Sequence, residues 1–170
     1  QKLIPGEDVL IDKDGEELEC LDVEKHVKTY NGKQFPHVVP QGATLSNKFV
    51  ATEDLKITHN HSIFIPEQGM FVPAAMTKMP HDTQQVDSYN YYHVFTANFF
   101  SDTIIANGIP CETHSKFIKQ RIMKADPSGK AMREILVACE AKPNGMRKRL
   151  SRQSVNQIIS KYENKASLKN

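Results

Sequence analysis

Closely spaced turn signals constrain the fold of the first 114 residues more than any other feature. Turn-forming clusters such as Lys13–Gly15, Asn31–Gly32 and Glu67–Gly69 separate short segments that are apolar or alternate apolar with polar residues. Turns at intervals of about 8–12 residues, with such segments between them, are typical of antiparallel strands. The sequence therefore predicts a mainly β domain of short strands and hairpins.

Each strand is expected to pair with its neighbour along the chain. Asn-Gly is the dipeptide that most favours a tight hairpin, so residues 31–32 are expected to connect two paired strands. The turn at residues 67–69 is expected to lead into a strand over residues 70–74. The expected pairs are residues 8–11 with 18–23, 27–30 with 35–39, 55–58 with 62–65, and 89–96 with 103–109, the last of which would close the sheet.

From Ser115 onward the apolar residues recur at helical spacing. One helix is expected to start at Asp126 and Pro127, as cap and first helical residue, and to end before Pro143. Ser151 is expected to cap a second helix. The apolar positions are Met132, Ile135, Leu136 and Cys139 in the first helix, and Val155, Ile158, Ile159 and Tyr162 in the second. We expect a β domain over residues 1–117 and a basic helical tail over residues 118–170.

The net charge of +2 conceals a large difference between the two parts of the chain. Residues 1–114 contain 8 lysines against 16 acidic residues, whereas residues 115–170 contain 14 basic residues, including all five arginines, against 4 acidic ones. A basic segment of this kind favours an acidic partner, which can be the first part of the chain, another segment of its precursor, a neighbouring subunit or nucleic acid. The residues expected to make such contacts are Arg147, Lys148, Arg149 and Arg152, and the alternative for this cluster is the solvated start of a helix.

Composition excludes several classes of protein. With 39% hydrophobic residues the chain can bury one core, but no apolar run approaches the roughly 20 residues that span a bilayer, so no membrane partner is expected. The three cysteines are too few and too scattered for a disulfide framework or a paired zinc site. No aromatic residues alternate with the basic cluster, which argues against stacking on nucleic-acid bases. No cofactor is expected.

Thr58 and His61 form a T-x-x-H step at the end of an expected strand. Breaking a peptide bond by acyl shift requires a proton donor for the departing amide nitrogen, and an imidazole can serve near neutral pH because its ordinary pKa is about 6.5. A threonine three residues earlier can orient the scissile bond by hydrogen bonding. We therefore expect Thr58 to be an orienting residue and His61 a general acid; the alternative is a partly buried histidine beside a threonine that favours a strand.

The segments before and after the T-x-x-H step resemble those of a known family. A strand with a preceding turn at Pro5–Leu10 comes before it, and Val72–Ala74, Tyr91–His93 and Ala106–Gly108 follow it in order. Together these segments, over roughly residues 5–117, resemble the Hint domain that hedgehog autoprocessing domains and inteins share, and most closely its bacterial type. The resemblance implies a compact β fold that cleaves a peptide bond near its own N-terminal edge, with Thr58, His61, His93 and Cys111 as catalytic residues.

Two departures from the family pattern limit the expected activity. A Hint domain begins with a Cys or Ser nucleophile about one hairpin before the position that Pro5 and Gly6 match, and the sequence begins at Gln1, so the nucleophile is expected on a preceding segment or the domain is inactive. Inteins end in His-Asn before a Cys, Ser or Thr, whereas Asn107 and Gly108 are followed by 62 further residues. Full splicing is therefore not expected, and cholesterol transfer has no support.

The remaining polar residues have alternative interpretations. Cys111, in the resemblance, can assist or resolve an acyl intermediate, or it is a small apolar residue that fills a strand end. Asp102 can orient His93 or His61, or it caps a turn. Cys111, Glu112, His114 and His93 are zinc-type ligands, but their spacing matches no recognised pair, so no metal is expected.

Two functions follow from the sequence. The first is an autoprocessing element that cleaves a peptide bond near its own N-terminal edge by acyl shift. The second is a catalytically silent Hint-like module that docks through its basic tail into a larger complex, such as a virion or another multi-subunit particle. An unrelated β-barrel binding domain is a third possibility.

Overall fold

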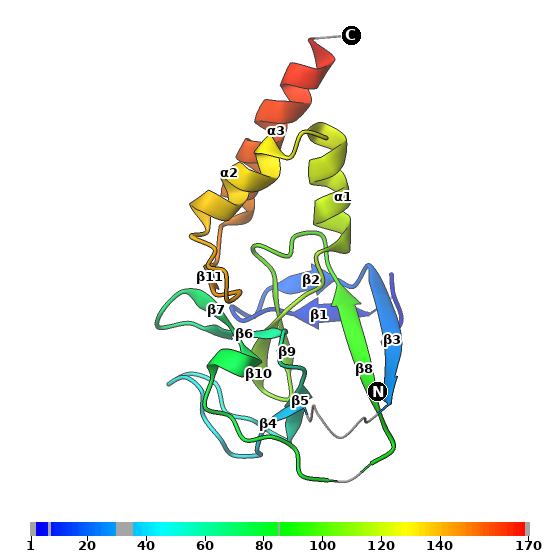
Figure 1. The fold of residues 1–170 in the computed structure, drawn as a ribbon, viewed down its shortest axis with the longest axis vertical. Helices are drawn as coiled ribbons and strands as arrows, with labels where there is room; N and C mark the ends of the chain where they lie inside the picture. The colour runs from blue at the N-terminus through cyan, green and yellow to red at the C-terminus, as the bar shows by residue number, and fades with distance from the viewer. Residues whose placement is uncertain (1–2, 7, 30–35, 85, 169–170) are drawn as a thin grey trace.

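The computed structural model describes residues 3–6, 8–29, 36–84 and 86–168, and it confirms a mainly β protein with helices toward the C-terminus. Short strands form one end of the molecule and three helices form the other, with the C-terminus at the tip of the last helix (Figure 1). The strands are β1 Val9–Ile11, β2 Glu17–Glu19, β3 Asp22–Thr29, β4 His37–Val39, β5 Leu55–Ile57, β6 Ser62–Ile65, β7 Met70–Pro73, β8 Ser88–Phe95, β9 Thr103–Ala106, β10 Ile109–Glu112 and β11 Arg147–Lys148. The helices are the 3-10 turn η1 Ala74–Met76, α1 Lys116–Ala125, α2 Lys130–Ala138 and α3 Arg152–Ser167.

The largest sheet has five strands in the order β11-β7-β6-β10-β9. Two of its pairs, β6 with β7 and β9 with β10, are tight antiparallel hairpins. In the second of these, Asn107 and Gly108 both have positive φ angles, 47° and 83°, as a type I′ turn requires. Only glycine fits at residue 108, because a Cβ atom there would lie 2.1 Å from the backbone oxygen of Val50.

Turn-directed pairings are confirmed where the turn is short. Strands β1 and β2 pair across the turn that contains Gly15, and β6 continues into β7 through the turn that contains Gly69. In both cases the turn glycine has a positive φ, 82° and 62° respectively, which glycine adopts without steric cost.

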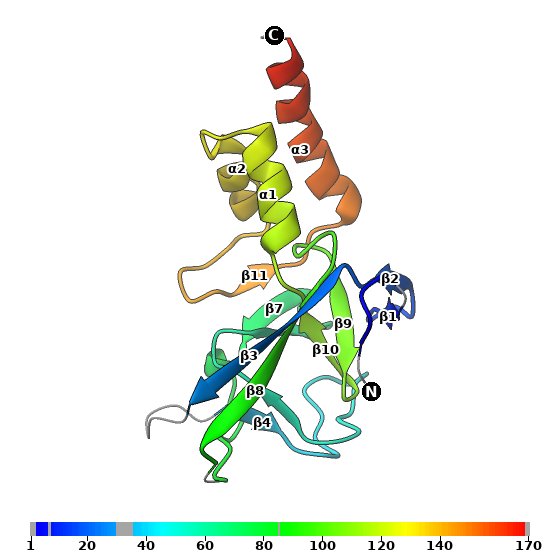
Figure 2. The same ribbon diagram turned by 90° about the vertical axis from the view of Figure 1, so that its right-hand side faces the viewer.

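Three other expected pairings are wrong. Strand β3 pairs along its whole length with β8, from Asp22 opposite Phe95 to Thr29 opposite Ser88, and in the described part of the chain it does not pair with residues 36–39. Strand β4 pairs with β5, so residues 55–57 do not pair with 62–65, and β9 pairs with β10 and not with β8. The β3–β8 ribbon is formed by eight cross-strand pairs between segments that lie far apart in the sequence (Figure 2). Residues 31–32 lie outside the described residues.

The helices form a core of their own. Helix α1 was not expected, and α2 begins three residues later than the Asp126–Pro127 pair predicts. Asp126 still caps the segment, because its carboxylate accepts a hydrogen bond from the Ala131 N–H at 2.7 Å. The expected cap of α3 is confirmed, since Ser151 Oγ accepts from the Ser154 N–H at 3.1 Å. The buried residues between the helices are Phe100, Ile118, Ile122, Ala125, Ala131, Ile135, Cys139, Val155 and Ile159.

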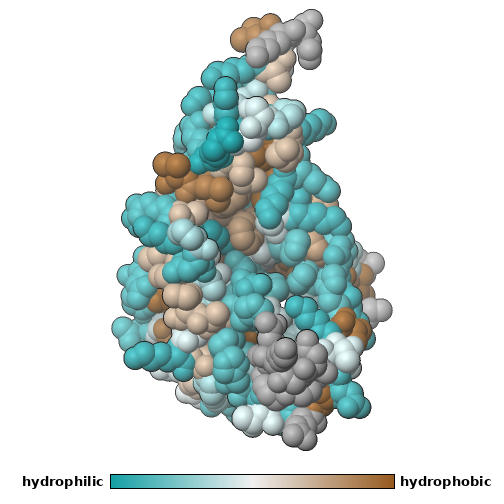
Figure 3. Space-filling view, viewed as in Figure 1, coloured by the Kyte–Doolittle hydropathy of each residue, from teal (hydrophilic) through white to brown (hydrophobic). Residues whose placement is uncertain are grey.

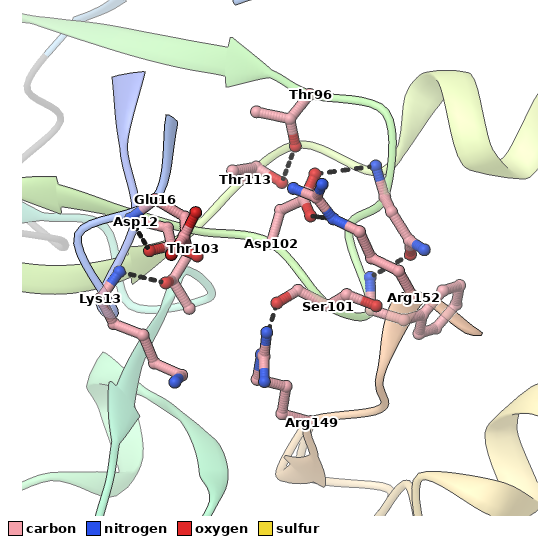
Figure 4. Close-up of polar contacts among 12 residues, drawn as sticks. Asp12, Lys13, Glu16, Thr96, Ser101, Asp102, Thr103, Thr113, Arg149 and Arg152 are labelled. Atoms are coloured by element: carbon pink, nitrogen blue, oxygen red, sulfur yellow. Dashed lines mark hydrogen bonds and ion pairs between the residues drawn. The ribbon is translucent and has the colours of Figure 1, made fainter. Parts of the chain in front are cut away.

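Polar and apolar contacts attach this helical part to the β part. Arg149 Nε–H donates to the Ser101 backbone oxygen at 2.6 Å, and Arg152 Nε–H donates to Asp102 at 2.9 Å (Figure 4). Strand β11, which lies in the expected tail, joins the five-stranded sheet beside β7. The expected boundary between residues 117 and 118 falls inside α1, so the basic segment is built into the fold of the β part.

The surface is largely hydrophilic on the face that Figure 3 shows, with hydrophobic residues gathered over α2, where Leu136 and Val137 are exposed. Among the described residues, no helix combines the length and the apolar character that crossing a membrane requires.

Candidate functional site

A cleft of about 300 Å³ brings together all four residues expected to be catalytic. Thr58 and His61 come from the turn between β5 and β6, His93 comes from β8, and Cys111 comes from β10. The four residues span 53 positions of the chain, from Thr58 to Cys111, so the tertiary fold is needed to place them around one cavity. The catalytic roles expected of them stay predictions.

Thr58 and His61 contact one another directly. The His61 N–H donates to the Thr58 backbone oxygen at 3.1 Å, which closes the turn, and a short hydrogen bond joins Thr58 Oγ1 to His61 Nδ1. The Ala74 N–H then donates to the His61 backbone oxygen at 2.8 Å, so the residue is also tied to the end of β7. Because Nδ1 is occupied by Thr58, Nε2 is the nitrogen that a substrate can use.

Four histidines form a cluster with His93 in the middle. The ring centroids of His61 and His93 lie 5.0 Å apart, those of His93 and His114 lie 4.7 Å apart, and those of His93 and His26 lie 4.5 Å apart. His114 reaches this position because its N–H donates to the Val94 backbone oxygen at 2.8 Å, which pairs the residue with the end of β8. His93 therefore occupies the centre of a histidine cluster.

The environment favours the neutral form of His61, His93 and His114. Burial, followed by the neighbouring His93 and His114, lowers the pKa of His61 from 6.5 to about 4. Burial is also the main cause that lowers the pKa of His93 and of His114. A neutral imidazole can accept a proton at neutral pH, and once protonated it can donate that proton. The role of His61 as a general acid stays a prediction.

Acid should destabilise the protein through His61. The unfolded state binds a proton at about pH 6.5, whereas the folded state resists protonation until about pH 4, so the unfolded state takes up more protons as the pH falls between these values. The free energy of unfolding should therefore be highest above pH 6.5 and should decrease by about 3 kcal/mol on acidification to about pH 4, at about 1.4 kcal/mol for each pH unit. Urea unfolding at a series of pH values measures this decrease.

The matched variant for this measurement is His61→Gln, which retains a polar side chain of similar length but does not titrate. Its stability should fall less steeply between pH 6.5 and pH 5 than that of the wild type. Carboxylates with lowered pKa values, such as those of Asp82 and Asp126, lose their contribution only nearer their ordinary range and do not affect this comparison. Equal slopes for the two proteins would contradict the lowered pKa of His61.

Cys111 is a buried thiol. It lies on β10 opposite Ile63 of β6, and its Sγ donates to the Ile109 backbone oxygen at 3.5 Å. Burial, followed by the charge of Glu112, raises its pKa to about 12, so the reactive thiolate is not populated at neutral pH. Its position favours the interpretation as a small apolar residue of the core, which it shares with Ile57 and Ile63.

Glu112 also lines the cleft, and the sequence analysis named it only as a zinc-type ligand. It accepts a hydrogen bond from the Ser62 N–H at 2.9 Å through Oε1 and from Arg147 at 3.2 Å through Oε2. The Arg147 guanidinium lies 3.9 Å from the ring centroid of Phe71 and 4.0 Å from that of Phe99. Burial raises the pKa of Glu112 and the Arg147 charge opposes that rise. Arg147 is buried on β11 and does not lie at a solvated helix start, and its partner Glu112 belongs to the acidic first part of the chain. Through Glu112, Arg147 stabilises the position of Ser62.

Asp102 and the other expected polar groups act elsewhere. Asp102 accepts from the Asn98 N–H at 3.1 Å and from Arg152, which confirms that it caps a turn and orients neither histidine (Figure 4). In the same region Thr96 Oγ1 donates to Thr113 Oγ1 at 2.8 Å, which ties the segment after β8 to the segment after β10.

Comparisons with family models, with curated proteins and with solved structures find no match to this chain. The assignment of a function therefore depends on the geometry of the cleft and on the sequence pattern.

Proposed function

We propose that this chain is a Hint-like autoprocessing domain that cleaves a peptide bond at its N-terminal side by acyl shift. The single observation that carries the proposal is the Thr58–His61 pair on a cleft that also contains His93 and Cys111. A buried histidine whose Nδ1 is fixed by a threonine presents Nε2 in a defined orientation, as a proton-transfer residue requires.

The chemistry requires a Cys or Ser on a segment before the β1 strand. Neutral His61 accepts the proton of that thiol or hydroxyl as its sulfur or oxygen attacks the preceding carbonyl carbon. The protonated imidazole then donates the proton to the amide nitrogen as the C–N bond breaks, which leaves a thioester or ester and a free amine. Water or another nucleophile then releases the preceding segment.

The start of the described chain lies beside the cleft lining. Leu3 packs against the small apolar cluster of Leu10, Leu18 and Cys20, and Val94 and Ile104 pack against the same cluster. Val94 and Ile104 also line the cleft. The start of the described chain and the cleft therefore share Val94 and Ile104 as neighbours, which supports an approach of a preceding segment from this side.

Intact mass spectrometry of the protein from its full reading frame tests this proposal. Incubation with hydroxylamine or dithiothreitol should release a fragment whose mass places the break immediately before an upstream Cys or Ser, and release should be faster with either reagent than without. A control in which that Cys or Ser is replaced by Ala should remain intact. A single uncleaved mass, unchanged by either reagent, would contradict the proposal.

A second candidate is a catalytically silent structural module with the same fold. The observation that favours it is that all three thiols, Cys20, Cys111 and Cys139, are buried. An uncleaved mass together with a defined complex in size-exclusion chromatography would support this candidate.

A further inference from the structure

Two strands that lie side by side bring three metal-ligand groups together at the edge of the histidine cluster. Glu24 and His26 lie on β3, two residues apart and on the same face, and His93 lies opposite Glu24 on β8. One potential ligand atom from each of these residues lies within 4.8 Å of those of the other two. Of these three residues, the sequence analysis named only His93 as a possible ligand. The β3–β8 pairing that brings Glu24 and His26 beside it cannot be predicted from a local turn.

We propose that Glu24, His26 and His93 form a binding site for a divalent transition-metal ion, with zinc as the best match to the donors. Two imidazoles and one carboxylate are a recognised ligand set for zinc sites that keep a fourth position open. The Glu24 Oε2 and His26 Nε2 atoms already lie 3.5 Å apart, close to the separation of two ligands on one tetrahedral ion. The side chains of both residues are partly exposed, at 38% and 44%, so they can adjust around an ion.

Neighbouring side chains orient Glu24 and His93 for metal binding. Lys116 Nζ donates to Glu24 Oε1 at 2.8 Å and leaves Oε2 for the metal, so the lysine orients the carboxylate without occupying its other oxygen. His93 is held neutral by burial, which lowers its pKa, and a neutral imidazole is the form that binds a metal. His114 stacks on His93 and restricts the rotation of its ring.

An ion at this site would affect the proposed proton transfer. His93 lies between the site and His61, with ring centroids 5.0 Å apart. A bound ion would hold the His93 ring, which lines the same cleft as His61, in one position and so restrict the approach of a scissile bond to His61. We therefore infer that zinc inhibits cleavage, and this part of the inference rests on the proposed function.

Calorimetric titration of the 170-residue chain with zinc chloride, after removal of metal with a chelator, tests the site itself. One ion should bind per chain, and His26→Gln, Glu24→Gln and His93→Gln should each weaken binding by at least about tenfold. The matched control is His81→Gln, because His81 belongs to another histidine pair, with ring centroids 4.2 Å from those of His37, that is not part of this ligand group. Circular dichroism confirms that each variant is folded.

Cobalt provides a second readout. Cobalt bound by histidine and carboxylate should show no thiolate-to-metal absorption, since no cysteine belongs to the proposed ligand set. Such absorption, or zinc affinity that is unchanged in all three ligand variants, would overturn the assignment.

The test separates the metal site from the autoprocessing proposal. In a precursor that cleaves, zinc should slow cleavage of the wild type but not of His26→Gln. Zinc binding in a precursor that never cleaves would leave the metal site standing and would contradict the proposed function. Cleavage without any zinc binding would contradict the metal site and leave the proposed function standing.

Discussion

Replacing His61 by glutamine in a precursor that carries the upstream nucleophile should slow release of the N-terminal segment by about 10² to 10⁴-fold. In the proposed mechanism the imidazole removes the proton from the attacking group and returns it to the departing amide nitrogen, and glutamine can do neither. The side chain lies in the turn that Thr58 and Ala74 hold in place, so the substitution leaves the backbone hydrogen bonds of the turn available. Quantitative mass spectrometry of the cleaved fraction over time measures the rate.

The matched control for this substitution is His59→Gln. His59 lies two residues earlier in the same turn but is absent from the lining of the cleft. His59→Gln makes the same replacement in the same turn but keeps the proposed proton-transfer group. The rate should therefore stay within about twofold of the wild type. A rate for His61→Gln equal to that of His59→Gln would remove His61 from the mechanism.

Replacing Arg147 by methionine should destabilise the folded protein by about 3–5 kcal/mol. The side chain of Arg147 is only 6% exposed and that of Glu112 is 10% exposed, so removal of the guanidinium leaves a buried carboxylate without its cation. Methionine retains most of the volume between Phe71 and Phe99, which separates the loss of charge from the loss of packing. Guanidinium chloride unfolding measures the change in the free energy of unfolding.

Two further variants make this prediction sharp. The neighbouring Lys148 side chain is 49% exposed. Lys148→Met should therefore change the free energy of unfolding by no more than about 0.5 kcal/mol. Adding Glu112→Gln to Arg147→Met should recover part of the loss, because glutamine removes the unpaired buried charge and keeps an acceptor oxygen for the Ser62 N–H. Equal effects of Arg147→Met and Lys148→Met would show that the ion pair does not support the fold.

The Arg147 ion pair also connects the basic segment to the cleft. Glu112 accepts the Ser62 N–H, and Ser62 directly follows His61. The helical segment therefore supports the residue next to the proposed catalytic histidine. A truncation that ends before β11 would remove this support and is expected to lower stability and cleavage together.

Local chemistry made part of this structure predictable. Glycine at positions 15 and 69 and the Asn107–Gly108 pair adopt positive φ angles at hairpin turns, which few other residues tolerate. Ser151 caps α3 through its own side chain. Thr58 and His61 are three positions apart, so one turn is enough to join their side chains. In each case the interacting groups are close in the sequence.

Contacts between distant segments were not predictable in the same way. Asn31 and Gly32 favoured a hairpin after β3, but β3 pairs with β8 about 60 residues later, and this pairing creates the Glu24–His26–His93 group. The charge pattern indicated that the basic segment meets acidic groups, but it did not show that Arg147 would be buried against Glu112. No property of either segment alone identifies its partner.

The sequence by itself determined the β character of the first part, the positions of its tightest turns and the Thr58–His61 pair, because these depend on the backbone preferences and hydrogen bonds of adjacent residues. The tertiary structure alone decided which strands pair, that four histidines form one cluster, and that Arg147 supports the cleft. These features depend on which distant segments pack together and exclude water, and on which buried charges then lie close enough to pair. Both are decided only when the whole chain has folded.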